Sequence, residues 1–493
     1  MPKITLPELE QWLWEAANIL RGPVDRADFK SYIFPLLFFK RISDIYDEEY
    51  EKALKESGDK EYASYDEQHR FIIPEGSHWK DIREKTVNVG QALQKALREI
   101  EKSNPDDLYG VFGDVNWTNK EQLPDELLID LIDHFSKKVL NKTNVEPDIL
   151  GQAYEYLIKK FADLSKNKAG EFYTPRAVVY LMGSILKPKE KETIYDPACG
   201  SGGMLLESYH YVKSHGGDVR TLKLYGQEKN LTTSSISRVN LFLHGIETFT
   251  IIRGDTLRSP KFLEGDQLSQ FDVVIANPPF SLENWGHENW THDPYGRNIA
   301  GTPPKGNGDY AWVQHMISSI AKPNGRMAII LPHGALFRGG VEARIRKALL
   351  DKDLLETVIG LGPNLFYGTG ISASILIFKL KKESNKKNKV YFIDGSHLFK
   401  KGRNQNFFLP EHAEQILSWY ESNKDIQNHA KIVDMKEIEE NDFNLNISMY
   451  VKKKQVVEAI DLKKTFKEVQ DVYQEFIESE KRMKALLKEV KIL

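Results

Sequence analysis

The feature that most limits how this 493-residue chain can fold is a ten-residue stretch, Phe271 to Phe280, which reads F-D-V-V-I-A-N-P-P-F. Its first six residues are mostly apolar and β-branched, which is typical of a buried parallel strand. Two consecutive prolines cannot donate to a strand ladder, so the strand must end at Asn277. An amide, two rigid carbonyl groups and an aromatic ring then stand at the carboxyl end of a strand, where open α/β sheets bind ligands. Taken alone, N-P-P also fits an asparagine-capped turn that the prolines stiffen.

Three upstream segments repeat this arrangement of a short strand followed by polar residues. The strands are predicted at Thr193 to Tyr195, Leu222 to Gly226 and Thr250 to Arg253, and the polar residues that follow them are Asp196, Glu228 and Asp255. Helical spacing between these strands predicts an α/β fold with a doubly wound, Rossmann-like sheet. Each acid, taken singly, also fits a solvated strand end. Four such strand ends in order favour one shared binding site.

The glycine-rich turn after the first strand separates two classes of ligand. It reads D-P-A-C-G-S-G-G, with glycines at Gly200, Gly202 and Gly203. This spacing differs from the G-x-G-x-x-G fingerprint of dinucleotide-binding proteins, and Asp196 stands where a pyrophosphate would be repelled. A positively charged ligand suits the acidic strand end better, and S-adenosylmethionine carries both a sulfonium and an ammonium group. The spacing therefore disfavours a dehydrogenase.

A second candidate binding segment, E-F-Y-T-P-R at Glu171 to Arg176, precedes the first strand. We expect Thr174 to be the N-cap and Pro175 the first residue of a helix that continues to Leu186. Free backbone amides at such a helix start can hold a carboxylate. On its own, the segment is better explained as an ordinary helix start.

Taken together, the motifs resemble those of the amino-methyltransferases that modify adenine in DNA. With the long N-terminal region, the chain closely resembles the modification (M) subunit of type I restriction-modification systems, and the similarity of the motifs spans residues 150–380. The resemblance implies S-adenosylmethionine as cofactor and no metal. It implies catalytic roles for Asn277, Pro278, Pro279 and Phe280. The cofactor-binding residues that it implies are Glu171, Phe172, Tyr173, Thr174, Pro175, Arg176, Asp196, Ser201, Gly202, Gly203, Glu228 and Asp255.

The chemistry of such a site can also be derived from the residues. The lone pair of the adenine N6 is delocalised into the ring, so acceptors that pull on both N6 hydrogens favour the pyramidal geometry of methyl transfer. Asn277 and the carbonyl of Pro278 would be these acceptors. The base must be flipped out of the duplex to be reached, and Phe280 offers it a stacking surface. A preference for adenine over the cytosine amino group is implied only by the resemblance.

Three regions are predicted from the change in pattern along the chain. Residues 1–165 have helical spacing throughout, residues 166–400 alternate strands with helices, and residues 401–493 form a C-terminal region. Within the second region, Ser281 to Gly308 is rich in Gly, Pro and Asn, and we expect a mobile lid that faces DNA. The C-terminal region ends in a heptad pattern formed by Leu462, Phe466, Val469, Tyr473, Phe476, Met483, Leu487 and Val490. That helix either folds back on its own domain or binds a partner, and the resemblance favours a partner.

Charge and composition limit the partners. The net charge of −3 is too small for the chain to grip nucleic acid by bulk electrostatics. The single cysteine, Cys199, and the lack of a membrane span or signal peptide predict a cytoplasmic protein. The resemblance implies DNA, a specificity (S) subunit that binds two copies of this chain, and a restriction (R) subunit in the full complex. Two alternatives remain: an N-P-P-F methyltransferase acting on RNA or protein glutamine, and a non-catalytic scaffold for a DNA-reading partner.

Overall fold

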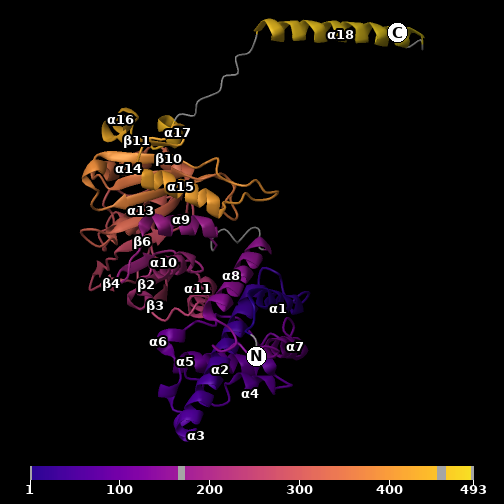
Figure 1. The fold of residues 1–493 in the computed structure, drawn as a ribbon, viewed down its shortest axis with the longest axis vertical. Helices are drawn as coiled ribbons and strands as arrows, with labels where there is room; N and C mark the ends of the chain where they lie inside the picture. Colours follow the sequence, from indigo (N-terminus) through magenta and orange to yellow (C-terminus); the bar gives the residue numbers. More distant parts are fainter. Residues whose placement is uncertain (1–2, 165–172, 452–461, 490–493) are drawn as a thin grey trace. The chain divides into compact units, whose positions relative to one another are not determined.

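The computed structural model describes residues 3–164, 173–451 and 462–489 (Figure 1). These residues fall into two compact units, one that ends at Val451 and one that contains the C-terminal helix α18 (Leu462–Glu489). Each unit is described by itself. None of the helices in these ranges combines the length and the apolar composition that crossing a membrane requires.

The N-terminal region of the first unit is helical, as predicted. Residues 3–164 contain α1 (Leu6–Ile19), α2 (Phe29–Ser57), α3 (Lys60–Ala63), α4 (Trp79–Arg83), α5 (Val89–Ser103), α6 (Pro105–Leu108), α7 (Asp125–Ser136) and α8 (Pro147–Leu164). The longest of them, α2, is buried from Tyr32 to Ile45 and ends at Gly58, which takes the left-handed conformation (φ 72°) that favours glycine at a helix end. The other helices pack their apolar faces around it to form one core.

The second half of this unit is built on a nine-stranded mixed sheet. Its strands, in spatial order, are β11 (Ala430–Asp434), β10 (Lys389–Asp394), β8 (Leu355–Gly360), β9 (Ala373–Lys379), β7 (Arg326–Pro332), β6 (Val273–Ala276), β1 (Thr193–Asp196), β2 (Lys223–Glu228) and β3 (Phe249–Arg253). The five strands from β7 to β3 are parallel, and β9 lies antiparallel between β7 and β8. The predicted sheet is confirmed, and it extends beyond residue 400 to Asp434. A separate two-stranded hairpin joins β4 (Leu263–Glu264) to β5 (Gln267–Leu268).

Helices cover both faces of the sheet, so that its central strands are buried on both sides. In β6, Val273 and Ile275 belong to one core, whereas Val274 and Ala276 belong to the other. The helices of this half are α9 (Arg176–Leu186), α10 (Gly203–Ser214), α11 (Leu231–Leu243), α12 (His287–Trp290), α13 (Asp309–Ser318), α14 (Val341–Asp351), α15 (Pro410–Ser422), α16 (Met435–Glu440) and α17 (Ile447–Tyr450). Burial on both faces explains why the β6 sequence is continuously apolar rather than alternating.

Helix α11 joins the helical region to the sheet. It follows β2 and packs on β3, yet three of its side chains, Ile236, Val239 and Leu243, belong to the N-terminal core. The hydroxyl of Tyr154 on α8 donates to the carbonyl of Ile236 at 3.3 Å. The two halves therefore share apolar packing as well as chain connectivity.

In the segment Ser281 to Gly308, which we predicted as a mobile lid that faces DNA, both tryptophan side chains are buried in the core. Trp285 and Trp290 are each 1% exposed and meet edge to face at 5.2 Å. Arg297 is also buried, where it pairs with Asp293 at 2.6 Å. A loop rich in Gly, Pro and Asn can pack on its own aromatic side chains, and local composition does not distinguish that case from a solvated lid.

Candidate active site

Asn277 stands directly after β6, held by a residue from far earlier in the chain. Its Nδ2 donates to the Thr174 hydroxyl oxygen at 2.9 Å, whereas its Oδ1 is buried and accepts no hydrogen bond from the described residues. The predicted N-cap role of Thr174 is wrong, because α9 is capped by Pro175 and Thr174 lies one residue outside the cap. That shift leaves the Thr174 hydroxyl available to orient the Asn277 amide, with the oxygen of the amide unpaired.

A cavity of about 680 Å³ opens at this edge of the sheet. It brings together eleven of the sixteen residues named from the sequence: Tyr173, Thr174, Arg176, Asp196, Ser201, Gly203, Glu228, Asn277, Pro278, Pro279 and Phe280. Glu171 and Phe172 lie outside the described residues. The other three, Pro175, Gly202 and Asp255, do not line the cavity.

Two of these three have other contacts. Gly202 has a φ of 81°, and a Cβ built on it would come within 2.7 Å of the Ser237 Oγ on α11. The close approach that requires glycine here is thus between α10 and α11. Asp255 pairs with Lys229 at 2.9 Å, beyond the cavity wall.

The glycine-rich turn is pinned to the end of the neighbouring strand. The Gly200 amide donates to the Glu228 carboxylate at 3.1 Å, and the Cys199 amide donates to the Gln227 carbonyl at 3.1 Å. A Cβ added to Gly203 would meet no other atom within 4 Å, so the first turn of α10 borders open space. Backbone and small side chains thus leave room for a ligand beside two carboxylates.

The electrostatics of this corner favour a cation. Asp196 is 1% exposed, and its burial, with a further contribution from the negative charge of Glu228, raises the pKa of Asp196 to about 8 despite the hydrogen bond that its carboxylate accepts from the Ala198 amide. A buried carboxyl beside a second carboxylate gains most from a positively charged ligand, because such a ligand favours the ionised form. The residues present therefore fit a sulfonium-containing cofactor.

Another part of the cavity wall holds a cluster of titratable side chains around Arg176. One guanidinium nitrogen of Arg176 lies 3.7 Å from the Glu155 carboxylate, and burial raises the pKa of both Glu155 and Glu207. His210 also lines the cavity, and burial lowers its pKa. This part of the wall presents charges of both signs.

Among the lining residues that the sequence analysis missed are two groups from parts of the chain far from the predicted motifs. One is the start of α2, where Asp28, Lys30 and Ser31 form part of the wall. The other is the loop between β8 and β9, where the Phe366 ring meets Phe280 edge to face at 5.7 Å and the Tyr367 hydroxyl donates to Asp163 at 3.0 Å. The second group could have been predicted, because β8 runs parallel to β7 and its carboxyl end lies at the edge where Asn277 lies. The sequence pattern of α2 does not indicate that Asp28, Lys30 and Ser31 line a cavity.

Comparison with known proteins identifies the family. The N-6 DNA Methylase model matches residues 145–459, and the HsdM N-terminal domain model matches residues 9–135. The chain is 34% identical over 519 aligned positions to the type I restriction enzyme MjaVII methylase subunit of Methanocaldococcus jannaschii, covering 99% of this chain and 84% of that protein. The chain belongs to the type I restriction enzyme methylase subunits. It is an adenine-specific DNA methyltransferase that forms N6-methyladenine.

Other methylase subunits agree with this assignment. The crystal structure of the type I methyltransferase subunit from Streptococcus thermophilus superposes with a TM-score of 0.79 at 34% identity, covering 91% of this chain and 100% of that one. The EcoKI methylase subunit of Escherichia coli K12 is 29% identical over 74% of this chain and 66% of its own length. The match of the DNA methylase model to residues 145–459 argues against the RNA and protein-glutamine alternatives.

Proposed function

We propose that the cavity binds S-adenosylmethionine together with the target adenine. Asp196 and Glu228 would face the positive charges of the cofactor, and the turn from Ser201 to Gly203 would give it room. The start of α9, with Arg176, would face its carboxylate. When bound, the cofactor supplies an electrophilic methyl group; the protein binds and orients both reactants. Glu171 and Phe172 remain proposed contacts from the sequence.

The observation that carries the proposal is the unpaired oxygen of Asn277. Because Thr174 occupies the amide nitrogen, Asn277 presents a buried acceptor with no competing partner among the described residues. An exocyclic amino group that donates one hydrogen there and the other to the Pro278 carbonyl would become more nucleophilic as it pyramidalises. Phe280 and Phe366 form an apolar corner against which the flipped base can stack.

The test compares variants of the two hydrogen-bonded residues in a complex able to methylate DNA. Asn277→Ala should lower kcat by about 10² to 10³-fold while cofactor affinity stays nearly unchanged, because the lost acceptor matters most in the transition state. Thr174→Val removes only the orienting oxygen and should cost less, and Thr174→Ser is the matched control. Near wild-type formation of N6-methyladenine by Asn277→Ala, or a product at cytosine, would contradict the mechanism.

We further propose that a specificity subunit supplies the DNA sequence preference. The chain carries a net charge of −3, which leaves little electrostatic affinity for duplex DNA. Within α18, apolar side chains from the predicted heptad pattern are exposed: Phe466, Val469, Tyr473, Phe476 and Met483. Val490 lies outside the described residues. An exposed apolar seam of this kind is suited to packing against helices of a partner, so we propose that α18 binds the specificity subunit. The proposed complex contains two copies of this chain per specificity subunit, together with a restriction subunit.

A further inference from the structure

The residue that follows the catalytic tetrapeptide has an unfavourable backbone conformation. Ser281 has a φ of 50°, in the left-handed region that residues with a Cβ rarely adopt. Such a residue keeps this conformation only when its surroundings hold it there, and strained positions of this kind cluster at functional sites. The backbone of Ser281 is continuous with Phe280, so its conformation affects where the Phe280 ring lies.

One carboxylate holds Ser281 in place. The Ser281 amide donates to the Asp309 Oδ1 at 2.8 Å, and Asp309, the first residue of α13, is 1% exposed. The adjacent Gly308 amide donates to the Leu282 carbonyl at 3.0 Å. Two hydrogen bonds therefore tie the residues immediately after Phe280 to the start of a helix that packs on the sheet.

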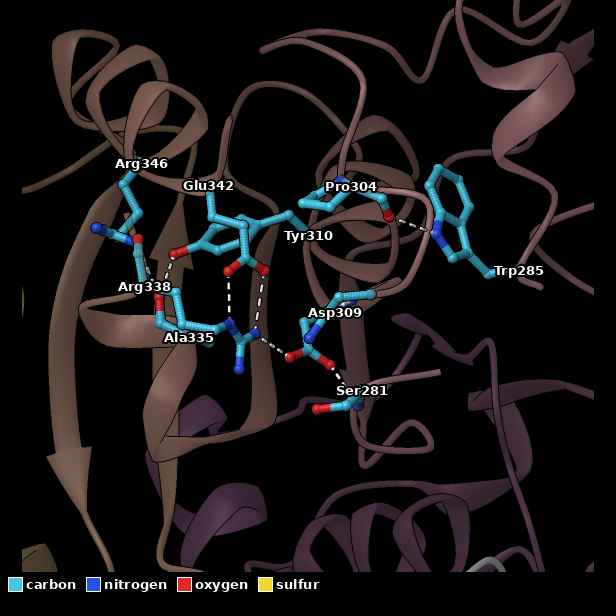
Figure 2. A network of polar contacts seen from close by, with 10 residues as sticks. Ser281, Trp285, Pro304, Asp309, Tyr310, Ala335, Arg338, Glu342 and Arg346 are labelled. Carbon is cyan, nitrogen blue, oxygen red and sulfur yellow. Dashed lines mark hydrogen bonds and ion pairs between the residues drawn. The ribbon is translucent and has the colours of Figure 1, made fainter. Parts of the chain in front are cut away.

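The carboxylate is itself fixed by an ionic network, which Figure 2 shows. Arg338 contacts the second oxygen of Asp309 and also pairs with Glu342 on α14, which is 3% exposed. The backbone around Arg338 is anchored as well, since Arg346 donates to the Arg338 carbonyl at 2.8 Å. Tyr310, next to Asp309, donates to the Ala335 carbonyl at 2.8 Å, so α13 and the segment after β7 are held together on either side of the ion pair.

We propose that Asp309 is a positioning residue for methyl transfer: by holding the Ser281 amide, it fixes Phe280 and the Pro278 carbonyl where the target adenine binds. The inference rests on the proposed role of Asn277 to Phe280 as the adenine site. Arg338 keeps the Asp309 carboxylate aimed at Ser281, because its charge-assisted contact with the second carboxylate oxygen, from a guanidinium that Glu342 holds bidentately, allows little rotation. A network that only joined α13 to α14 would have no need to contact the backbone beside Phe280.

The experiment uses the complete methyltransferase complex and measures four quantities for each variant: kcat, cofactor affinity by calorimetry, the thermal unfolding midpoint, and the fluorescence of 2-aminopurine placed at the target adenine. Asp309→Ala should lower kcat about 100-fold, since misplacing reacting groups by about 1 Å has an effect of that size. The 2-aminopurine signal should change with kcat, because the flipped base loses its ordered position beside Phe280. Cofactor affinity should stay within about twofold of the wild type. Asp309→Asn keeps an acceptor for the Ser281 amide but loses the negative charge, so its kcat should lie between those of the wild type and Asp309→Ala.

A rescue variant separates positioning from general support. Glycine adopts positive φ without a steric penalty, so the double variant Asp309→Ala, Ser281→Gly should have a kcat about tenfold higher than that of Asp309→Ala alone. Ser281→Ala keeps the amide and should behave like the wild type. Trp285→Phe is the matched control, because it removes the Trp285 hydrogen bond to Pro304 in the same loop without touching Ser281.

Two outcomes would overturn the inference. The first is an Asp309→Ala variant whose kcat and 2-aminopurine signal equal those of the wild type. The second is a loss that appears equally in cofactor affinity and unfolding temperature and that Ser281→Gly does not relieve, since this would mark the network as structural support alone. A wild-type complex that forms no N6-methyladenine would instead overturn the adenine site itself, and with it this inference.

Discussion

Binding of S-adenosylmethionine should release protons from Asp196. Burial and the nearby Glu228 raise the pKa of Asp196 to about 8, so at pH 7 about nine-tenths of the ligand-free molecules carry a neutral carboxyl at this position. A cationic ligand binds the ionised form better and pulls the pKa down. Up to about 0.9 protons per site should therefore leave the protein on binding at pH 7.

The same shift sets the pH dependence of affinity. If the cofactor binds only the ionised carboxylate, affinity follows the ionised fraction, which rises about tenfold from pH 6 to pH 7 and about fivefold from pH 7 to pH 8. Above the raised pKa the contribution of Asp196 levels off. The α-amino group of the cofactor titrates in the same range, and this is why a variant protein is needed as reference.

The assay is titration calorimetry at pH 7 in buffers of different ionisation enthalpy, which counts the protons released. Asp196→Asn keeps the shape and an oxygen for the Ala198 amide but cannot titrate, so proton release should fall to that of the cofactor alone. S-adenosylhomocysteine lacks the sulfonium charge and should release fewer protons from the wild type. Equal proton release by the wild type and Asp196→Asn would refute the assignment of the raised pKa to a carboxyl that faces the ligand.

Two further predictions concern folding and assembly. Gly202→Val should lower the free energy of unfolding by about 2 to 4 kcal/mol, because the new side chain collides with Ser237 and the φ of this residue is unfavourable for valine. Gly203→Ala is the control: its Cβ meets nothing within 4 Å, so it should leave the free energy of unfolding nearly unchanged. Chemical denaturation measures both variants, and equal effects would contradict the packing argument. Deleting the residues after Val451, or replacing Phe466 and Phe476 by serine, should abolish both pull-down of the specificity subunit and sequence-specific methylation, whereas cofactor binding should survive. Glu468→Ser is the control. Retained pull-down by the deletion or the double variant would show that α18 is not the docking helix.

Local patterns predicted the sheet well because each strand is short, apolar and closed by a turn. The observed α9 begins one residue after its predicted start at Pro175 and ends, as predicted, at Leu186. Strand β6 ends at the residue before Asn277, since the prolines leave no alternative. The errors arose where a side chain could choose between local and distant partners. A threonine before Pro175 is a good N-cap by pattern, yet its hydroxyl is used by Asn277, 103 residues later in the chain.

Other features that the sequence did not reveal have the same physical origin. Trp285 and Trp290 stand in a segment whose composition resembles that of a solvated loop, and only tertiary packing makes them core residues. Lys30 belongs to α2, where the spacing of apolar residues predicts burial in the N-terminal core. That spacing does not indicate that the start of the helix lines a cavity. The strained φ of Ser281 is also invisible in the sequence, because serine is common in ordinary turns.

The wall that α2 contributes to the cavity bears on how such subunits can be recombined. A chimera joined near residue 165 would place Asp28 and Lys30 from one parent around a ligand held by Asp196 and Glu228 from another. A slip of one helical turn in α2, about 5.4 Å, would carry its side chains out of reach of that ligand. Because α11 also contributes to the N-terminal core, the mismatch would extend to the packing beneath the site. The workable junction between two such parents therefore lies after Val451, where the compact unit ends.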